Sequence, residues 1–137
     1  MTRSTSGIVA GAIAILALWT GAAANASPVA VSDDVGNTVE LARPATRIVS
    51  LAPHVTELLF AAGAGAQVVG VVAYSDFPAE AQKLPEVGSY NNVDMERVAA
   101  LRPDLVVAWS SGNRDAHLDK LRALGIPVYL NEPRSEE

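Results

Sequence analysis

The spacing of hydrophobic positions changes several times between residues 29 and 72, and each spacing predicts a different element. Apolar and polar residues alternate in Val29–Ser32 and again in Thr38–Leu41, on either side of an Asp/Gly/Asn turn, which is typical of a β-hairpin. Arg47–Ser50 and Val68–Val72 instead hold consecutive apolar residues, typical of strands that are covered on both faces. This part of the chain therefore predicts a hairpin followed by buried strands.

A helix is predicted between those two buried strands. Pro53 suits its first turn, where a helix needs no backbone N–H. Apolar side chains then recur at i, i+3, i+4 and i+7, on one helical face, at Val55, Leu58, Leu59 and Ala62. Gly63 and Gly65 follow and predict the helix end.

The second half of the chain continues the alternation of strand and helix. A short helical piece at 79–83 leads to a very short strand at 85–88. Asp94 can cap a helix that reaches Leu101, and Asn113 can cap a last helix. That last helix would turn Leu118, Leu121 and Leu124 inward and end before Gly125, and strands are predicted at Leu105–Ala108 and Val128–Leu130. Strands alternating with helices predict an α/β, Rossmann-like lobe with a mainly parallel sheet, preceded by the hairpin.

Residues 1–26 have the features of a cleavable secretion signal. Arg3 is the only charge before Asp33, and residues 7–24 are apolar or small. Ala24-Asn25-Ala26 forms an A-x-A cleavage site before Ser27, whereas an uncleaved membrane anchor would need a stronger apolar run than this Ala- and Gly-rich one. We therefore expect a mature domain of 27–137, with Trp19 lost with the signal.

Composition excludes several classes of function. The net charge is -5, from 10 basic and 15 acidic residues without a basic run, which argues against nucleic-acid binding. The chain has no cysteine, so disulfides, thiolate metal sites and a lipid anchor on an N-terminal cysteine are excluded. Secretion without lipidation predicts a periplasmic protein.

Aromatic residues follow three of the predicted strands. Tyr74, Tyr90 and Trp109 would converge beyond the carboxyl ends of a parallel sheet, where such folds bind ligands. Aromatic faces supply large apolar contacts, and Tyr and Trp keep a polar group, which suits a large, partly apolar ligand. The same loops contain three further candidates for ligand contact: Pro53, Ser75 and Asn91. Plugging of the sheet edge is the alternative role for any single aromatic.

Signatures of catalysis and of metal binding are weak. His54 and His117 have no partner at metal-ligand spacing; packing or capping explains His54 better than ligand contact, and His117 is expected in solvent. The Asp33-Asp34 pair fits a polar turn better than a metal site. Glu96, in the first turn of its helix, is explained by the positive helix end alone. No catalytic or metal residue is predicted.

Several segments together resemble the first lobe of the periplasmic binding proteins for cobalamin, haem and ferric siderophores. They are residues 47–63 (RIVSLAPHVTELLFAAG), 69–72 (VGVV), 96–98 (ERV), 101–107 (LRPDLVV) and 121–128 (LRALGIPV). Residues 74–78 (YSDFP) and 108–113 (AWSSGN) are similar to loops of the cobalamin-binding branch, with Phe77 replacing a Tyr. Tyr90 takes the place of a Trp that the branch often carries six positions before Glu96.

The resemblance implies a binding protein of an ABC importer rather than an enzyme. Tyr74, Tyr90 and Trp109 would line a corrinoid cleft, and Glu96 would dock on an Arg of the membrane permease. The family has two lobes joined by a long helix, so 27–137 would be the first lobe of a longer product. We expect a monomer that carries cobalamin as its transported ligand, needs no cofactor, and meets the membrane only through the transporter.

Two alternatives stay open. The same fold could bind haem, with His54, Tyr74 or Tyr90 as an axial ligand, or a ferric siderophore, for which Arg114 is the only nearby cation. A small secreted hydrolase is a more distant alternative, because no nucleophile lies beside an identifiable base.

Overall fold

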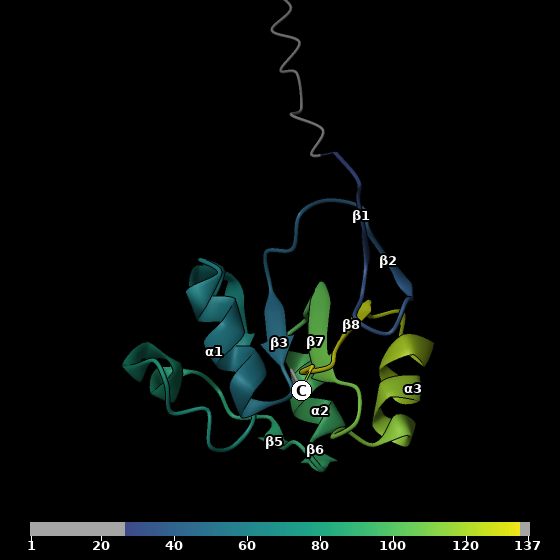
Figure 1. Cartoon of the computed structure of the whole chain (residues 1–137). Helices are drawn as coiled ribbons and strands as arrows, with labels where there is room; N and C mark the ends of the chain where they lie inside the picture. The colour runs from purple at the N-terminus through teal and green to yellow at the C-terminus, as the bar shows by residue number, and fades with distance from the viewer. Residues whose placement is uncertain (1–26, 135–137) are drawn as a thin grey trace, which may run out of the picture.

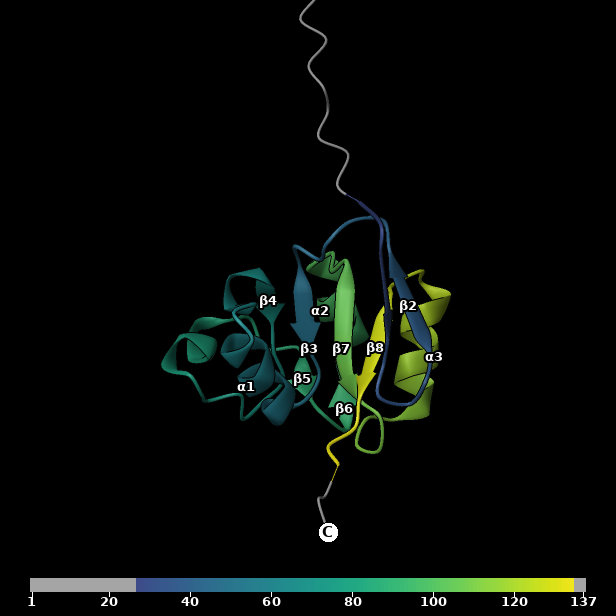
Figure 2. The same cartoon turned by 45° about the horizontal axis from the view of Figure 1, so that its top comes forward.

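A four-stranded, fully parallel sheet forms the centre of the protein. The computed structural model describes residues 27–134, so the predicted signal lies outside the described residues. The sheet has the order β4–β3–β7–β8, and the strands are β3 (Ile48–Ser50), β4 (Val68–Gly70), β7 (Leu105–Trp109) and β8 (Val128–Asn131). In Figure 2 the arrowheads of β3, β7 and β8 point the same way. The prediction of an α/β fold with a parallel sheet is confirmed.

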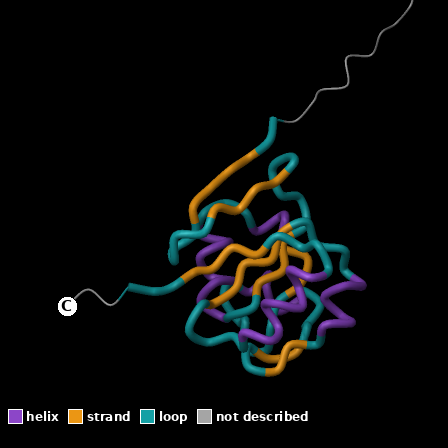
Figure 3. Tube along the Cα trace, turned by 90° about the vertical axis from the view of Figure 1, so that its right-hand side faces the viewer, coloured by secondary structure: helices purple, strands orange, loops and turns teal. Residues whose placement is uncertain are grey.

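Helices cover both faces of this sheet. They are α1 (Pro53–Ala61), α2 (Met95–Ala100), α3 (Asp115–Ala123) and two 3₁₀ helices, η1 (Gly65–Gln67) and η2 (Ala79–Lys83). Figure 2 shows α1 in front of the sheet and α2 behind it, and Figure 3 shows the strands running between helices. The right-handed crossovers of parallel strands require helices on the sheet faces, so this layering follows from the strand order.

The two faces of the sheet carry cores of different size. Successive strand residues point to opposite faces, so Ile48 and Val107 pack under α1 with Ala52 and Val55. The opposite face holds the larger cluster, whose members include Val49, Val106, Leu118 and Leu121. Most of the apolar burial therefore lies on the α2–α3 side.

Two small antiparallel hairpins lie at different sides of the sheet. β1 (Val29–Ser32) pairs with β2 (Thr38–Leu41), as predicted, and β5 (Gly88–Ser89) pairs with β6 (Asn92–Val93). In Figure 1 the β5–β6 hairpin lies below the carboxyl ends of β3 and β7, and the β1–β2 hairpin lies on the β8 side.

The turn of the β1–β2 hairpin is tied to β8 through aspartates. The carboxylate of Asp33 accepts hydrogen bonds from the backbone N–H of Val35, Asn37 and Leu130, and the N–H of Asp34 donates to the Leu130 carbonyl. Asp33 and Asp34 therefore form the polar turn that the sequence predicted.

Three element predictions need correction. Residues 85–88 form no regular strand; they make one isolated parallel bridge, between Val71 and Glu86, before the chain turns into β5. Leu124 is 54% exposed rather than inward, because α3 ends at Ala123 and Leu124 is its C-cap. On α1 only Val55 of the predicted apolar face is fully buried, and Leu58 is 53% exposed, because this short helix covers only part of the sheet.

Two helix ends follow the sequence signals. The carboxylate of Asp94 accepts from the N–H of Glu96 and of Arg97, so it caps α2 as predicted. Gly63 has a φ of +83° just after α1, a conformation that favours glycine.

Candidate functional site at the carboxyl edge of the sheet

The centre of the candidate site is the side chain of Trp109, at the end of β7. The Trp109 ring lies 5.6 Å from the Tyr90 ring, tilted by 47°, and 5.2 Å from the His54 ring in an edge-on arrangement of 86°. The Trp109 ring also rests against Gly112, where a Cβ atom would overlap the indole. Edge-on and tilted ring pairs are favourable arrangements of aromatic quadrupoles. Loops far apart in sequence thus build one aromatic surface.

Asn113 holds the backbone around this surface. The sequence predicted that Asn113 caps α3, and this prediction is wrong. The N-cap of α3 is Arg114, which makes no capping side-chain bond. The Oδ1 atom of Asn113 accepts from the Trp109 N–H at 2.6 Å. Its Nδ2 atom donates to the carbonyls of Tyr90, at 2.7 Å, and of Leu51, at 3.0 Å. The side chain is used for tertiary contacts and is therefore not available to the helix.

Tyr74 stands apart from the other two aromatics. It is 83% exposed, has a φ of +66°, and makes no aromatic ring contact among residues 27–134. The N–H of the preceding Ala73 donates to the Gly88 carbonyl at 2.7 Å, which ties the Tyr74 loop to the hairpin that carries Tyr90. The structure thus brings Tyr90 and Trp109 together and leaves the Tyr74 ring in solvent at the same edge.

Ser75 belongs to a buried chain of hydroxyl groups instead of the open surface. Thr56 Oγ1 lies 3.0 Å from Ser75 Oγ and 2.8 Å from Ser50 Oγ, and the Ser50 hydroxyl donates to the Ala52 carbonyl. A single donor direction, from Ser75 through Thr56 and Ser50 to Ala52, satisfies every hydroxyl. Ser75 is only 5% exposed, so its side chain anchors the Tyr74 loop.

The two remaining predicted contact residues lie at the same edge. Pro53 is half-buried at the first position of α1, whose N-terminus has no side-chain cap. Asn91 is exposed in the β5–β6 turn, and its Oδ1 accepts from the Ser89 hydroxyl at 2.9 Å.

A polar chain behind the aromatic surface fixes His54. Its Nε2 lies 2.9 Å from Asn131 Oδ1, and Asn131 Nδ2 donates to the Asp34 carboxylate at 2.8 Å. A carboxylate only accepts, so the amide nitrogen of Asn131 faces Asp34 and the amide oxygen faces the ring. His54 must then carry its proton on Nε2. His54 thus packs against Trp109, as one of the two expected roles required, but it does not cap α1, whose N-cap is Ala52 without a side-chain bond.

His117 differs from the expectation that it lies in solvent. It is half-buried on α3, and its Nδ1 has no hydrogen-bond partner among the described residues.

Glu96 is exposed in the first turn of α2. Its carboxylate makes no ion pair and no hydrogen bond with residues 27–134. The neighbouring Arg97 instead pairs with Asp94 at 3.3 Å and donates to the Glu86 carbonyl.

Two groups outside the aromatic surface have shifted pKa values. Burial and the negative charge of Asp34 raise the pKa of Tyr129, whose hydroxyl lies 3.4 Å from that carboxylate. Burial alone would raise the pKa of Asp104, but hydrogen bonds from Thr46 and Arg47 outweigh it, and the pKa lies below its usual value.

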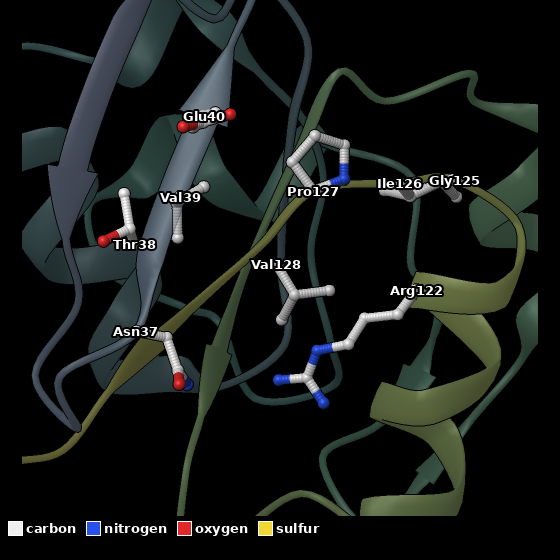
Figure 4. Close-up of a pocket in the computed structure, with 9 residues that line it drawn as sticks. All are labelled: Asn37, Thr38, Val39, Glu40, Arg122, Gly125, Ile126, Pro127 and Val128. Carbon is white, nitrogen blue, oxygen red and sulfur yellow. The ribbon is translucent and has the colours of Figure 1, made fainter.

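Two hollows in the described part of the chain have neither Tyr90 nor Trp109 among their lining residues. A shallow pocket of about 500 Å³ lies between β2 and the end of α3 (Figure 4), where Arg122 and Glu40 are the charged lining residues. An apolar groove of about 340 Å³ runs between α1 and the β7–β8 part of the sheet. Within residues 27–134 no three His, Asp or Glu side chains gather as metal ligands, and none of the helices there has the length and hydropathy that crossing a bilayer requires.

Sequence reasoning missed Asn113 and Gly112 as site residues. Both lie within four positions after the strand-end Trp109, and that position was the available signal. An Asn just before a helix is also the pattern of a cap, so the sequence alone favoured the wrong role.

Comparisons with known proteins identify relatives of the chain. A vitamin B12-binding protein from Yersinia pestis (strain Pestoides F) is 49% identical over 92 residues, which cover 67% of this chain and 33% of that protein. The periplasmic vitamin B12-binding protein BtuF of Vibrio cholerae superposes with a TM-score of 0.61 at 46% identity, covering 64% of this chain and 34% of that one. The periplasmic haem-binding protein RhuT from Roseiflexus sp. RS-1 gives a TM-score of 0.59 at 34% identity, covering 63% and 33%.

The chain spans about a third of the length of the curated relatives that it matches. Residues 48–137, more than half of the chain, match the family profile described as periplasmic binding protein. The chain belongs to the periplasmic binding protein family.

Proposed function

We propose that this chain forms the ligand-binding first lobe of a periplasmic solute-binding protein that captures a corrinoid for an ABC importer. It acts by capture and delivery, with no bond chemistry and no cofactor of its own. The observation that carries the proposal is the Tyr90–Trp109 ring pair at the carboxyl edge of the sheet. Relatives named for vitamin B12 binding share 46–49% identity with the chain.

The aromatic surface suits a broad, partly apolar ligand. Tyr90 is 41% exposed and Tyr74 is 83% exposed, so both rings can give contact area to a ligand that lies across the edge. Pro53, at the start of α1, and Asn91, in the β5–β6 turn, are the further proposed contacts of the ligand. Aromatic side chains lose little conformational entropy on binding, which favours them for such a surface. Ser75 supports the Tyr74 loop from within and is not part of the proposed contact surface.

The proposal extends to the form and place of the mature protein. Residues 1–26 direct secretion and are removed, and 27–137 form the first of two lobes of a monomeric periplasmic protein. The match to only a third of each relative supports a second lobe that supplies the opposite wall of the cleft. N-terminal sequencing of the secreted protein should begin at Ser27, and a start at Met1 would count against the signal.

Titration of cyanocobalamin into the full-length protein by calorimetry tests the ligand. We expect saturable one-site binding that is weakened about tenfold or more by Trp109→Ala or Tyr90→Ala, because each removes a stacking face. Leu124→Ala is the matched control, since Leu124 is exposed on α3. Undetectable binding by a folded parent protein would reject the corrinoid.

Haem is the second candidate, because the Tyr74 phenol is exposed at this edge and haem-binding proteins are among the solved relatives. Mixing with haemin should then shift the Soret band, and Tyr74→Phe should abolish the shift if the phenolate ligates iron. An unshifted band would reject haem.

Glu96 is the proposed docking residue for the permease. Its exposed carboxylate has no partner within the described residues and is therefore available to a cation on another protein. Such rim charges mainly change the association rate and its salt dependence. We expect Glu96→Gln to slow uptake in cells while corrinoid affinity stays unchanged, and Glu80→Gln, another exposed acid in a first helical turn, to do neither.

A further inference from the structure

Three backbone segments meet at the amide of Asn113. The side chain is 5% exposed and contacts the end of β7 through Trp109, the β5–β6 turn through Tyr90, and the start of α1 through Leu51. Trp109, Tyr90 and Leu51 lie 4, 23 and 62 positions before Asn113, so the amide joins segments that are far apart in sequence.

Each hydrogen-bonding group of this amide is occupied in a way that only asparagine allows. One oxygen accepts a backbone N–H, and one nitrogen donates its two hydrogens to two different carbonyls. Aspartate would keep the acceptor but set a carboxylate oxygen against two carbonyl oxygens. Alanine would leave one buried and two partly buried backbone groups without this partner, and such losses are costly.

Asn113 also controls the two aromatic rings through their backbones. Both polar backbone groups of Trp109 bind Asn113, because the Asn113 N–H donates to the Trp109 carbonyl at 3.0 Å while its Oδ1 accepts the Trp109 N–H. The Tyr90 carbonyl is held by the same side chain, so one amide sets the separation of the residues whose rings lie 5.6 Å apart.

We propose that Asn113 is a positioning residue for ligand binding, which presets the Tyr90–Trp109 surface by locking three loops together without touching the ligand. The inference rests on the proposed function, because it assigns that surface to the corrinoid. A preset surface binds more tightly, since ordering it does not draw on the interaction energy of the ligand.

The test compares Asn113→Asp and Asn113→Ala with the parent protein and with Asp104→Asn. Asp104→Asn removes a carboxylate that accepts backbone hydrogen bonds at the amino end of β7, whereas the aromatic surface lies at the carboxyl end. This variant therefore controls for a loss of stability alone. Three properties are measured: cyanocobalamin affinity, urea unfolding, and quenching of Trp109 fluorescence by acrylamide. Within the printed sequence Trp109 is one of two tryptophans, and the other, Trp19, lies in the predicted signal. Trp109→Phe in the full-length protein identifies the part of the fluorescence that belongs to Trp109.

We expect Asn113→Ala and Asn113→Asp to weaken binding about tenfold or more and to increase quenching of Trp109, whereas Asp104→Asn changes neither. The affinity of Asn113→Asp relative to the parent should recover partly as the pH falls, because a protonated carboxyl regains one O–H donor for a facing carbonyl. A purely structural loss of stability would give no such recovery.

Parent-like affinity and quenching in both Asn113 variants would overturn the proposal, as would equal weakening by Asp104→Asn. If the folded parent does not bind cyanocobalamin, the corrinoid assignment fails by itself. Quenching and near-UV circular dichroism of the same variants then still decide whether Asn113 presets the aromatic pair.

Discussion

At the scale of single residues, Gly112 determines where the Trp109 ring can lie. A methyl group at position 112 would overlap the six-membered ring, while the backbone there has no positive φ that would itself require glycine. Gly112→Ala must therefore push the indole away from its place between His54 and Tyr90. We expect a changed near-UV circular dichroism signal and weaker cyanocobalamin binding. Leu124→Ala, at an exposed position on the end of α3, is the control that should leave both unchanged.

The protonation of His54 is a second property fixed by neighbouring residues. Asp34 orients the amide of Asn131, and that amide accepts from His54. We expect nitrogen NMR to find the Nε2–H tautomer in the parent and a mixture of tautomers in Asn131→Ala. A mixture already present in the parent would contradict the orientation of the Asn131 amide.

At the scale of elements, Asp104 joins the beginnings of β3 and β7. Its carboxylate accepts from the N–H of Thr46 and Arg47 and from the Thr46 hydroxyl, each at 2.9 Å. Because its pKa is lowered in the folded state, the stabilisation is present above the pKa of the unfolded chain and is lost as the pH falls through the folded pKa. Asp104→Asn should lower the free energy of unfolding at neutral pH, and the difference from the parent should shrink in acid. Urea titrations at neutral and acid pH measure it, and a difference independent of pH would contradict the role of the charge.

Elements were predictable wherever local signals and tertiary contacts agree. The partners of the Asp94 carboxylate among the described residues, two backbone N–H groups and the Arg97 guanidinium, all belong to α2 itself, so its capping role was predicted correctly from local sequence. Asn113 had the same local signal, but three distant backbone groups compete for its amide, and sequence spacing contains no information about them. The strand predicted at 85–88 was wrong for a similar reason, because the chain turns into the β5–β6 hairpin after a single bridge.

The candidate site was predictable in its location more than in its contacts. The rule that ligands bind beyond the carboxyl ends of parallel strands located Tyr90 and Trp109, and the two rings do meet. The rule could not tell that Tyr74 points into solvent or that Ser75 is buried against Thr56, since both depend on how the loop after β4 folds back.

At the scale of the whole molecule, stability is expected to reside mainly on the α2–α3 face of the sheet. Leu121 is fully buried in the larger cluster, whereas Leu124, three residues later on the same helix end, is 54% exposed. Leu121→Ala should lower the free energy of unfolding by about 2–5 kcal/mol, because it removes buried methyl groups and leaves a cavity. Leu124→Ala should change it by less than about 0.5 kcal/mol. Urea unfolding of the pair provides the measurement, and equal losses would mean that α3 does not hold the core of this lobe.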